Sequence, residues 1–311
     1  MDSTFTYSPS KWVPFRDTEV LERVRKIKRE DLTKHSNSKF RIRIVNDDDA
    51  EFLFIADMFY RIKEAADAGD KVVLILPNPV PSYRKVAHLI NKFKVNCRNL
   101  YAFAMDEYAN EDGVIAPETW RQGFMCAMMH NFYYQIDESL RPPVERFIAP
   151  NNKNINDYGK MIADLGGADV CYSGPGWTGH LAFIEPDAPE FDAPLEEWKR
   201  MGTRIVTLSP FTLAQNSLHG SFGMSGDIAL VPPKAATIGP AEVIASKSRL
   251  EIHALSVHNT DTAWQRLISR LVLHGPVTPR IPSSIHQILE TDCIVSETIA
   301  RDIAPNWDKG Y

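Results

Sequence analysis

The sequence lacks long apolar runs and has few cysteines. No run among its 311 residues approaches the roughly 18 apolar residues that a membrane-spanning helix needs. The first 17 residues contain no apolar segment typical of a secretory leader. The four cysteines (Cys97, Cys126, Cys171 and Cys293) are scattered, form no C-x-x-C pair and match no zinc-ligand spacing. These absences lead us to expect a cytoplasmic protein with reduced thiols and with no membrane partner.

The chain also lacks the excess of basic residues that nucleic-acid binding favours. Its 35 Lys and Arg are outnumbered by 40 Asp and Glu, for a net charge of −5. The basic stretch Arg23–Arg29 is flanked by Glu19, Glu22, Glu30 and Asp31, which favours a solvated helix face over a phosphate-binding arm. We therefore expect no nucleic-acid partner. A hydrophobic fraction of 44% and a charged fraction of 24% are typical of a globular chain.

Strand-like and helix-like segments alternate from residue 40 onward. Strands are predicted from Phe40 and over Lys71–Leu76, Leu100–Met105, Ala168–Ser173, Thr203–Leu208 and Leu250–Ser256, and helices over Ala50–Ala68, Ser82–Phe93, Glu118–Tyr134, Ile155–Leu165 and Asp261–Leu273. This alternation predicts an α/β fold with a doubly wound, mostly parallel, Rossmann-like sheet and helices on both faces. Residues 1–39 are interpreted as an N-terminal extension with one helix, and residues 40–311 as a single domain.

Two segments that follow predicted strands carry candidate catalytic side chains. Met105–Tyr108 (MDEY) offers two adjacent carboxylates, although Asp106 capping a turn beside a solvated Glu107 is the plainer alternative. Ser173–Pro186 (SGPGWTGHLAFIEP) combines glycines, which allow close backbone approach to a ligand, with His180 and Glu185. Ligands of doubly wound sheets bind beyond the carboxyl ends of the strands, where both segments are expected.

Together the two segments resemble the glucosamine-6-phosphate deaminase/isomerase family, whose wider group includes the 6-phosphogluconolactonases. Shorter likenesses support the resemblance at Pro117–Trp120, Phe132–Tyr133, Gln215–Ser217, Ala236–Gly239, Gly275–Thr278 and Pro282–Ser284. The resemblance covers roughly residues 40–290, and it favours the deaminase branch over the lactonases. It implies a sugar or sugar-phosphate substrate, a homo-oligomer, and no metal or other cofactor.

The resemblance assigns roles to particular residues. It makes Asp106 the base that moves a proton between C2 and C1 of the open-chain sugar. His180 assists ring opening, and Glu185 tunes that histidine. The residues expected to bind substrate are Asn78, Glu107, Gly176, Trp177, Thr178 and Gly179. For Trp177, stacking on a sugar face and packing under the loop stay open as alternatives.

The sequence departs from the family pattern at the ring-opening acid and at three phosphate contacts. Thr178 stands where the family has an aspartate. Pro77–Ser82, with three prolines, replaces a Gly-rich loop that presents N–H groups to phosphate. Leu218 replaces a phosphate-binding arginine, and no lysine lies between His258 and Arg270, where the family has one. The loss of all three phosphate contacts together suggests that the substrate differs from that of the family.

Four functions remain open at this point. The first is a sugar isomerase or deaminase whose substrate lacks the 6-phosphate or carries another group there. The second is a conventional glucosamine-6-phosphate deaminase with a rebuilt phosphate site that uses Arg84, His219 or Arg266. The third, motivated by Thr178, is a catalytically weak sugar-binding or regulatory protein. The fourth is a lactonase-like hydrolase with His180 as its base.

Overall fold

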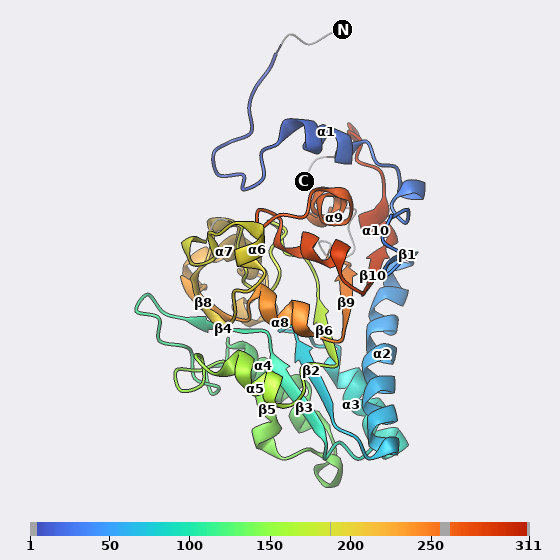
Figure 1. The fold of residues 1–311 in the computed structure, drawn as a ribbon, viewed down its shortest axis with the longest axis vertical. Helices are drawn as coiled ribbons and strands as arrows, with labels where there is room; N and C mark the ends of the chain where they lie inside the picture. The colour runs from blue at the N-terminus through green and yellow to red at the C-terminus, as the bar shows by residue number, and fades with distance from the viewer. Residues whose placement is uncertain (1–4, 187, 256–261, 310–311) are drawn as a thin grey trace.

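A central parallel sheet organises the chain (Figure 1). The structure is a computed structural model that describes residues 5–186, 188–255 and 262–309. The sheet has seven strands in the order β1-β10-β9-β6-β2-β3-β5, and each neighbouring pair is parallel. The strands are β1 (Phe40–Val45), β2 (Val72–Leu76), β3 (Leu100–Ala104), β5 (Phe147–Ile148), β6 (Val170–Ser173), β9 (Ser248–His253) and β10 (Thr291–Ser296). The predicted α/β fold class is confirmed.

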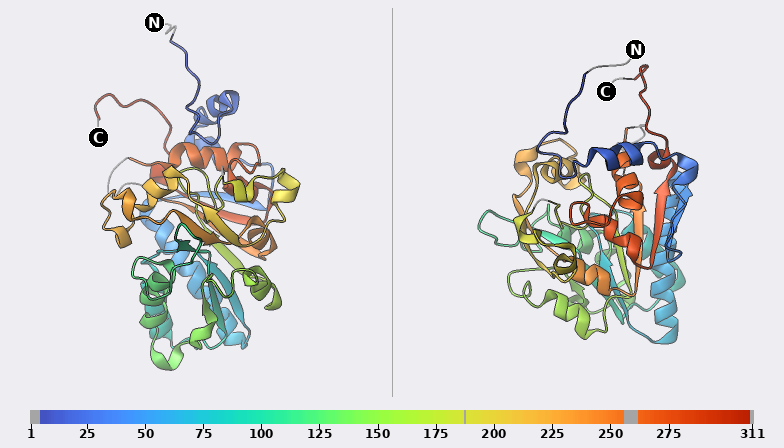
Figure 2. Two further views of the ribbon diagram at one scale, coloured as in Figure 1. Left: turned by 90° about the vertical axis from the view of Figure 1, so that its left-hand side faces the viewer. Right: turned by 45° about the horizontal axis from the view of Figure 1, so that its top comes forward.

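Helices cover both faces of this sheet (Figures 1 and 2). They are α1 (Thr18–Arg25), α2 (Asp47–Ala68), α3 (Tyr83–Phe93), α4 (Phe124–Asn131), α5 (Tyr158–Asp164), α6 (Leu195–Trp198), α7 (Pro210–Asn216), α8 (Pro240–Ala245), α9 (Gln265–His274) and α10 (Glu297–Ala300), with a 3₁₀ helix, η8, at Pro282–Ile288. No helix in the described part of the chain is long and apolar enough to cross a membrane.

The residues of strand β2 pack alternately against the two faces of the sheet, and both faces are buried. Val72, Leu74 and Leu76 pack into the core cluster under α2 and α3. Val73 and Ile75 point the other way, into the cluster under α5 and α8. A continuous β-branched and leucine-rich run is what a strand buried on both faces requires, since alternate side chains face opposite layers.

A second, antiparallel sheet was not predicted. It has three strands in the order β4-β8-β7: β4 (Asp106–Ala109), β8 (Lys234–Thr237) and β7 (Arg204–Thr207). The MDEY segment therefore continues from β3 into a strand rather than into a loop. Because neighbouring residues of a strand point to opposite faces, this change determines which of its two carboxylates reaches the site.

Two predicted helices are shorter than expected. The helix predicted over Glu118–Tyr134 is confined to α4, which begins at Phe124 after turns and ends at Asn131. In the N-terminal extension, α1 is followed by a separate 3₁₀ turn at Arg29–Asp31, and its Leu21 and Val24 pack on α9. The predicted bounds Ser256 and Asp261 lie outside the described residues.

Candidate active site

A cavity of about 420 Å³ lies at the carboxyl ends of β2, β3, β6 and β9. Its lining comes from Pro77–Ser82 after β2, from Asp106 after β3, and from Ser173–Gly176 at the end of β6. The start of α2 and the end of α7 complete the walls. This is the edge at which parallel α/β sheets bind ligands, so segments far apart in the sequence converge here.

Asp106 is a buried carboxylate in this cavity. Its side chain is 6% exposed, and its Oδ1 atom has no hydrogen-bond partner among the described residues. Burial raises the pKa of Asp106 well above its usual value, and the adjacent Glu107 raises it further. A carboxylate with a raised pKa is a stronger base than one in water, which suits removal of a proton from carbon.

Glu107 faces away from the cavity, which corrects the prediction that it binds substrate. Its Oε1 accepts hydrogen bonds from the backbone N–H groups of Tyr108 (2.8 Å) and Phe124 (3.0 Å), and its Oε2 accepts one from Met125 (2.8 Å). Two of these donors belong to the first turn of α4, where N–H groups have no partner inside the helix. Glu107 therefore caps α4 from the opposite face of β4, while Asp106 faces the cavity.

His180 lines the cavity from the loop after β6. Its Nδ1 atom lies 3.1 Å from the hydroxyl oxygens of both Thr178 and Thr212, and 3.7 Å from Glu185 Oε2. Burial, and to a lesser extent the nearby His219, lowers the pKa of His180 to about 4. The imidazole is therefore neutral near pH 7, with one nitrogen able to donate a proton and the other able to accept one.

Gly176 has a steric role beside His180. A side chain at position 176 would overlap the imidazole ring at its Nε2 edge. Gly176 and Asn78 both line the cavity, as expected of substrate-binding residues. Asn78 Oδ1 is buried without a hydrogen-bond partner among the described residues. Buried polar atoms in proteins almost always have partners, so this oxygen is a candidate contact for a bound ligand.

Trp177, Thr178 and Gly179, three predicted substrate contacts, do not line the cavity. Trp177 stacks on Trp264 with ring centroids 5.5 Å apart, on the outer side of the loop. Thr178 contacts His180 instead. Gly179 adopts a φ of +77°, a conformation that glycine adopts without strain, and its carbonyl accepts a hydrogen bond from Ser283. Of these three residues Trp177 is exposed, whereas Thr178 and Gly179 are buried outside the cavity lining and Thr178 contacts His180.

The cavity contains polar residues that the sequence indicated only weakly. Gln215, Asn216 and His219 line it from the end of α7 and the following turn. Burial lowers the pKa of His219 to about 4, so its ring is uncharged near pH 7, and its Nδ1 has no hydrogen-bond partner among the described residues. The sequence signals for this wall were the likeness at Gln215–Ser217 and the naming of His219 as a possible phosphate-site residue.

The lining carries negative but not positive side chains. Among the described residues that line the cavity none is Lys or Arg, and residues 256–261 contain neither type in the sequence. Asp47 and Glu51 lie at the rim, in the first turns of α2. Glu51 accepts hydrogen bonds from Ser82 and Lys85, and Asp47 accepts two from Thr298. The site is therefore poor in groups that attract a phosphate.

Metal-ligating side chains do not gather in the described structure. Across residues 5–186, 188–255 and 262–309, no group of three or more His, Cys, Asp or Glu side chains is arranged to hold a metal ion.

Known proteins with similar sequences are sugar-phosphate enzymes. The chain is 30% identical over 222 residues to a glucosamine-6-phosphate deaminase of Aliivibrio salmonicida, covering 69% of this chain and 75% of that protein. It is 28% identical over 229 residues to the protein of the same name from Phocaeicola vulgatus, covering 72% and 77%. No protein-family model matches the chain.

Solved structures with the same fold belong to two enzyme types. A monomeric glucosamine-6-phosphate deaminase aligns with a TM-score of 0.67 at 20% identity, covering 83% of this chain and 98% of that one. A 6-phosphogluconolactonase from Leishmania guyanensis aligns with a TM-score of 0.59 at 12% identity, covering 85% and 98%. At these identities the two structures establish the likeness of fold.

Proposed function

Because the chain belongs to the glucosamine-6-phosphate deaminase family, we propose that it transfers a proton between C2 and C1 of a sugar or amino sugar that carries no phosphate. The family assignment makes the chain an enzyme of the sugar isomerase and deaminase class. One observation carries the specific proposal. Asp106 and His180 line one cavity whose described lining contains no lysine or arginine.

Asp106 is the base in this proposal. Its carboxylate removes the proton from C2 of the open-chain aldose, and the resulting acid delivers a proton to C1 while the proton of the O2 hydroxyl passes to O1, which gives the ketose. With a 2-amino sugar the same transfer gives an imine at C2, and hydrolysis by water releases ammonia. The high proton affinity that burial gives Asp106 supports this role, because C–H acids need a strong base.

His180 opens the sugar ring in this proposal. A neutral imidazole accepts the proton of the O1 hydroxyl and supplies a proton to the ring oxygen, so no net charge is left on the protein. Hydroxyl groups of Thr178 and Thr212 fix Nδ1 of the ring, with Glu185 farther away at 3.7 Å. This set of contacts supports ring opening by a histidine that stays uncharged.

The rim of the cavity supports a substrate without phosphate. The N-terminal end of a long helix such as α2 normally attracts anions, but Asp47, Asp48 and Asp49 occupy its first turn. Pro77, Pro79 and Pro81 in the loop after β2 have no N–H group to offer. A dianionic phosphate would therefore meet carboxylates and few donors.

A rebuilt phosphate site finds little support among the described residues. Neither Arg84 nor Arg266 lines the cavity. His219 lines it, but with a pKa of about 4 its ring carries no charge near pH 7. The alternative of a conventional glucosamine-6-phosphate deaminase is therefore the less favoured one.

Deuterium uptake tests the proposal. The protein is incubated in D₂O with glucosamine, galactosamine, glucose and mannose, each with and without a 6-phosphate, while proton NMR follows C2 and an assay follows ammonia. We expect exchange with an unphosphorylated sugar. Exchange confined to glucosamine 6-phosphate, with ammonia release, would support the conventional deaminase, and binding without exchange would support a sugar-binding protein.

A further inference from the structure

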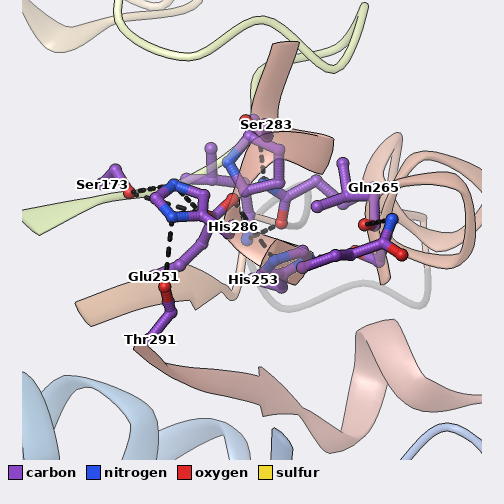
Figure 3. Close-up of polar contacts among 12 residues, drawn as sticks. Ser173, Glu251, His253, Gln265, Ser283, His286 and Thr291 are labelled. Atoms are coloured by element: carbon purple, nitrogen blue, oxygen red, sulfur yellow. Dashed lines mark hydrogen bonds and ion pairs between the residues drawn. The ribbon is translucent and has the colours of Figure 1, made fainter. Parts of the chain in front are cut away.

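Figure 3 shows a cluster of buried polar side chains, one of which, Ser173, also lines the cavity. It comprises Ser173 at the end of β6, Glu251 and His253 on β9, and His286 on η8, and we call it the Glu251 cluster. Glu251, His253 and His286 are each 0% exposed. None of these three lines the cavity, whereas Ser173 does. The cluster therefore has one member in contact with the proposed substrate site.

The carboxylate of Glu251 is held ionised by its neighbours. His286 Nε2 contacts Glu251 Oε2, and His253 Nε2 lies 3.6 Å from Oε1. These two imidazoles lower the pKa of Glu251 to about 2, against the effect of its burial. An ionised carboxylate only accepts hydrogen bonds, so every group that contacts it through hydrogen must be a donor.

Ser173 is one of those donors. Its hydroxyl donates to Glu251 Oε2 across 3.4 Å, and its Oγ lies 3.3 Å from His286 Nε2. A hydroxyl has one proton and two lone pairs. Because the proton of Ser173 is directed toward the buried carboxylate, only lone pairs remain for the cavity side. Ser173 thus presents to the cavity an acceptor whose direction is set by the buried carboxylate of Glu251.

The same geometry argues against a nucleophilic serine. In a Ser-His-acid triad, the acid and the serine contact opposite nitrogens of the imidazole. Here both Glu251 and Ser173 contact Nε2 of His286, and Nδ1 lies 3.4 Å from the Thr291 hydroxyl. His286 therefore cannot take the serine proton while the carboxylate orients it from the other side.

We propose that Ser173 is a specificity-determining residue that accepts a hydrogen bond from a hydroxyl group of the sugar. The inference rests on the proposed function, since it assumes a sugar in the cavity. Strand β6 is two strands from β3, which leads into Asp106, so their ends are roughly 10 Å apart. The recognised group therefore belongs to the part of the sugar away from C1 and C2.

Two serine variants test the proposal. Ser173→Ala removes the cavity acceptor, while Ser269→Ala is a matched control, since Ser269 is equally buried and bonds His253 Nδ1 (2.7 Å) but does not line the cavity. Affinities for glucosamine, galactosamine, glucose, mannose and their single-position deoxy analogues are measured by NMR titration. We expect Ser173→Ala to weaken the best sugar about fivefold, as loss of one neutral hydrogen bond implies. Ser269→Ala should change that affinity less than about twofold.

The deoxy analogues identify the contact. At one position beyond C2, the analogue that lacks the contacted group should bind the native protein and Ser173→Ala equally. If Ser173→Ala binds every sugar as tightly as the native protein, the role of Ser173 is overturned while the proposed function stands. If no sugar binds even the native protein, both proposals fail.

A measurement without any sugar gives an independent check. The ¹³C signal of the Glu251 side-chain carboxyl, assigned with a Glu251→Gln variant, should be that of an ionised group at pH 5. A protonated Glu251 at that pH would free the Ser173 proton to point into the cavity and would overturn the proposal whatever the sugars do.

Discussion

Asp106 and Glu251 are both buried carboxylates at the carboxyl-terminal side of the same parallel sheet, yet their pKa values move in opposite directions. Burial raises the pKa of Asp106, and the adjacent Glu107 raises it further. Burial also acts on Glu251, but His286 and His253 overcome it and bring the pKa to about 2. The comparison teaches that the partners of a buried carboxylate, rather than its depth, set its protonation.

The two surroundings suit two tasks. Asp106 keeps one oxygen without a partner in the described structure and faces a cavity, which leaves it able to bind a proton from a substrate. Glu251 is enclosed by imidazoles and Ser173 and keeps its charge. The carboxylate proposed for proton transfer and the carboxylate proposed to orient Ser173 thus lie a few strands apart.

Replacing Asp106 with asparagine should give the largest effect. Asparagine has nearly the same shape but cannot take a proton from carbon, so we expect C2 exchange to fall about 100- to 10,000-fold. The rate of deuterium uptake measures this loss, and sugar affinity by NMR titration serves as the control for an intact site. Exchange that persists at the native rate would remove Asp106 from the reaction.

The same variant should change stability with pH. A pKa raised by folding means that, between the pKa values of the unfolded and folded states, the folded state binds more protons. Asp106 therefore lowers the free energy of unfolding as pH rises through that range. The free energy of unfolding of Asp106→Asn, relative to the native protein, should therefore increase from pH 4 to pH 8. A difference that stays constant with pH would contradict the raised pKa.

Removing Glu251 should destabilise the fold by about 3–5 kcal/mol, since Glu251→Ala leaves the buried imidazoles of His286 and His253 without their carboxylate partner. Urea unfolding at pH 7 measures the loss. The control is the double variant Glu251→Leu with His286→Leu, which removes both members of the buried polar contact and restores apolar packing, and which should recover most of that stability. If Glu251→Ala lowers the free energy of unfolding by less than about 1 kcal/mol, the contact between Glu251 and His286 contributes little to stability.

His180 should make the protein acid-sensitive by a smaller amount. Its pKa is about 4 in the folded state against 6.5 for an ordinary histidine, so the unfolded state binds the extra proton first. The stability that neutral His180 contributes is present above pH 6.5 and is lost as pH falls toward 4, by about 3 kcal/mol. His180→Gln should flatten this part of the pH profile of unfolding, and an unchanged profile would contradict the shift.

Much of the fold was predictable because several strands carry a local pattern, either a continuous apolar run or an alternation of apolar and polar residues. The apolar run at 71–76 predicted β2 to within one residue at its start, and the alternation from Phe40 predicted β1. Strand β4 was missed because its four residues, DEYA, pair with β8, more than 120 residues later, and carry no local apolar pattern. That omission led to the wrong placement of Glu107.

The site was predicted in part. The resemblance identified the two segments that carry Asp106 and His180. The structure places both residues in one cavity, because the parallel sheet brings those segments together. The catalytic roles of Asp106, His180 and Glu185 stay predictions. The assembly of the chain into a homo-oligomer also stays a prediction. The Glu251 cluster was not predicted, since its members come from β6, β9 and η8 and a charged residue in a strand ordinarily indicates an exposed face.

The most direct test of the central claim compares glucosamine with glucosamine 6-phosphate in one deuterium-uptake experiment. Both sugars offer the same C2 proton to Asp106 and differ only in the group at C6, for which the described lining of the cavity offers no lysine or arginine. The account predicts faster C2 exchange with glucosamine than with its 6-phosphate. Faster exchange with the 6-phosphate would contradict it and would mean that the protein binds phosphate without a lysine or arginine in the described lining.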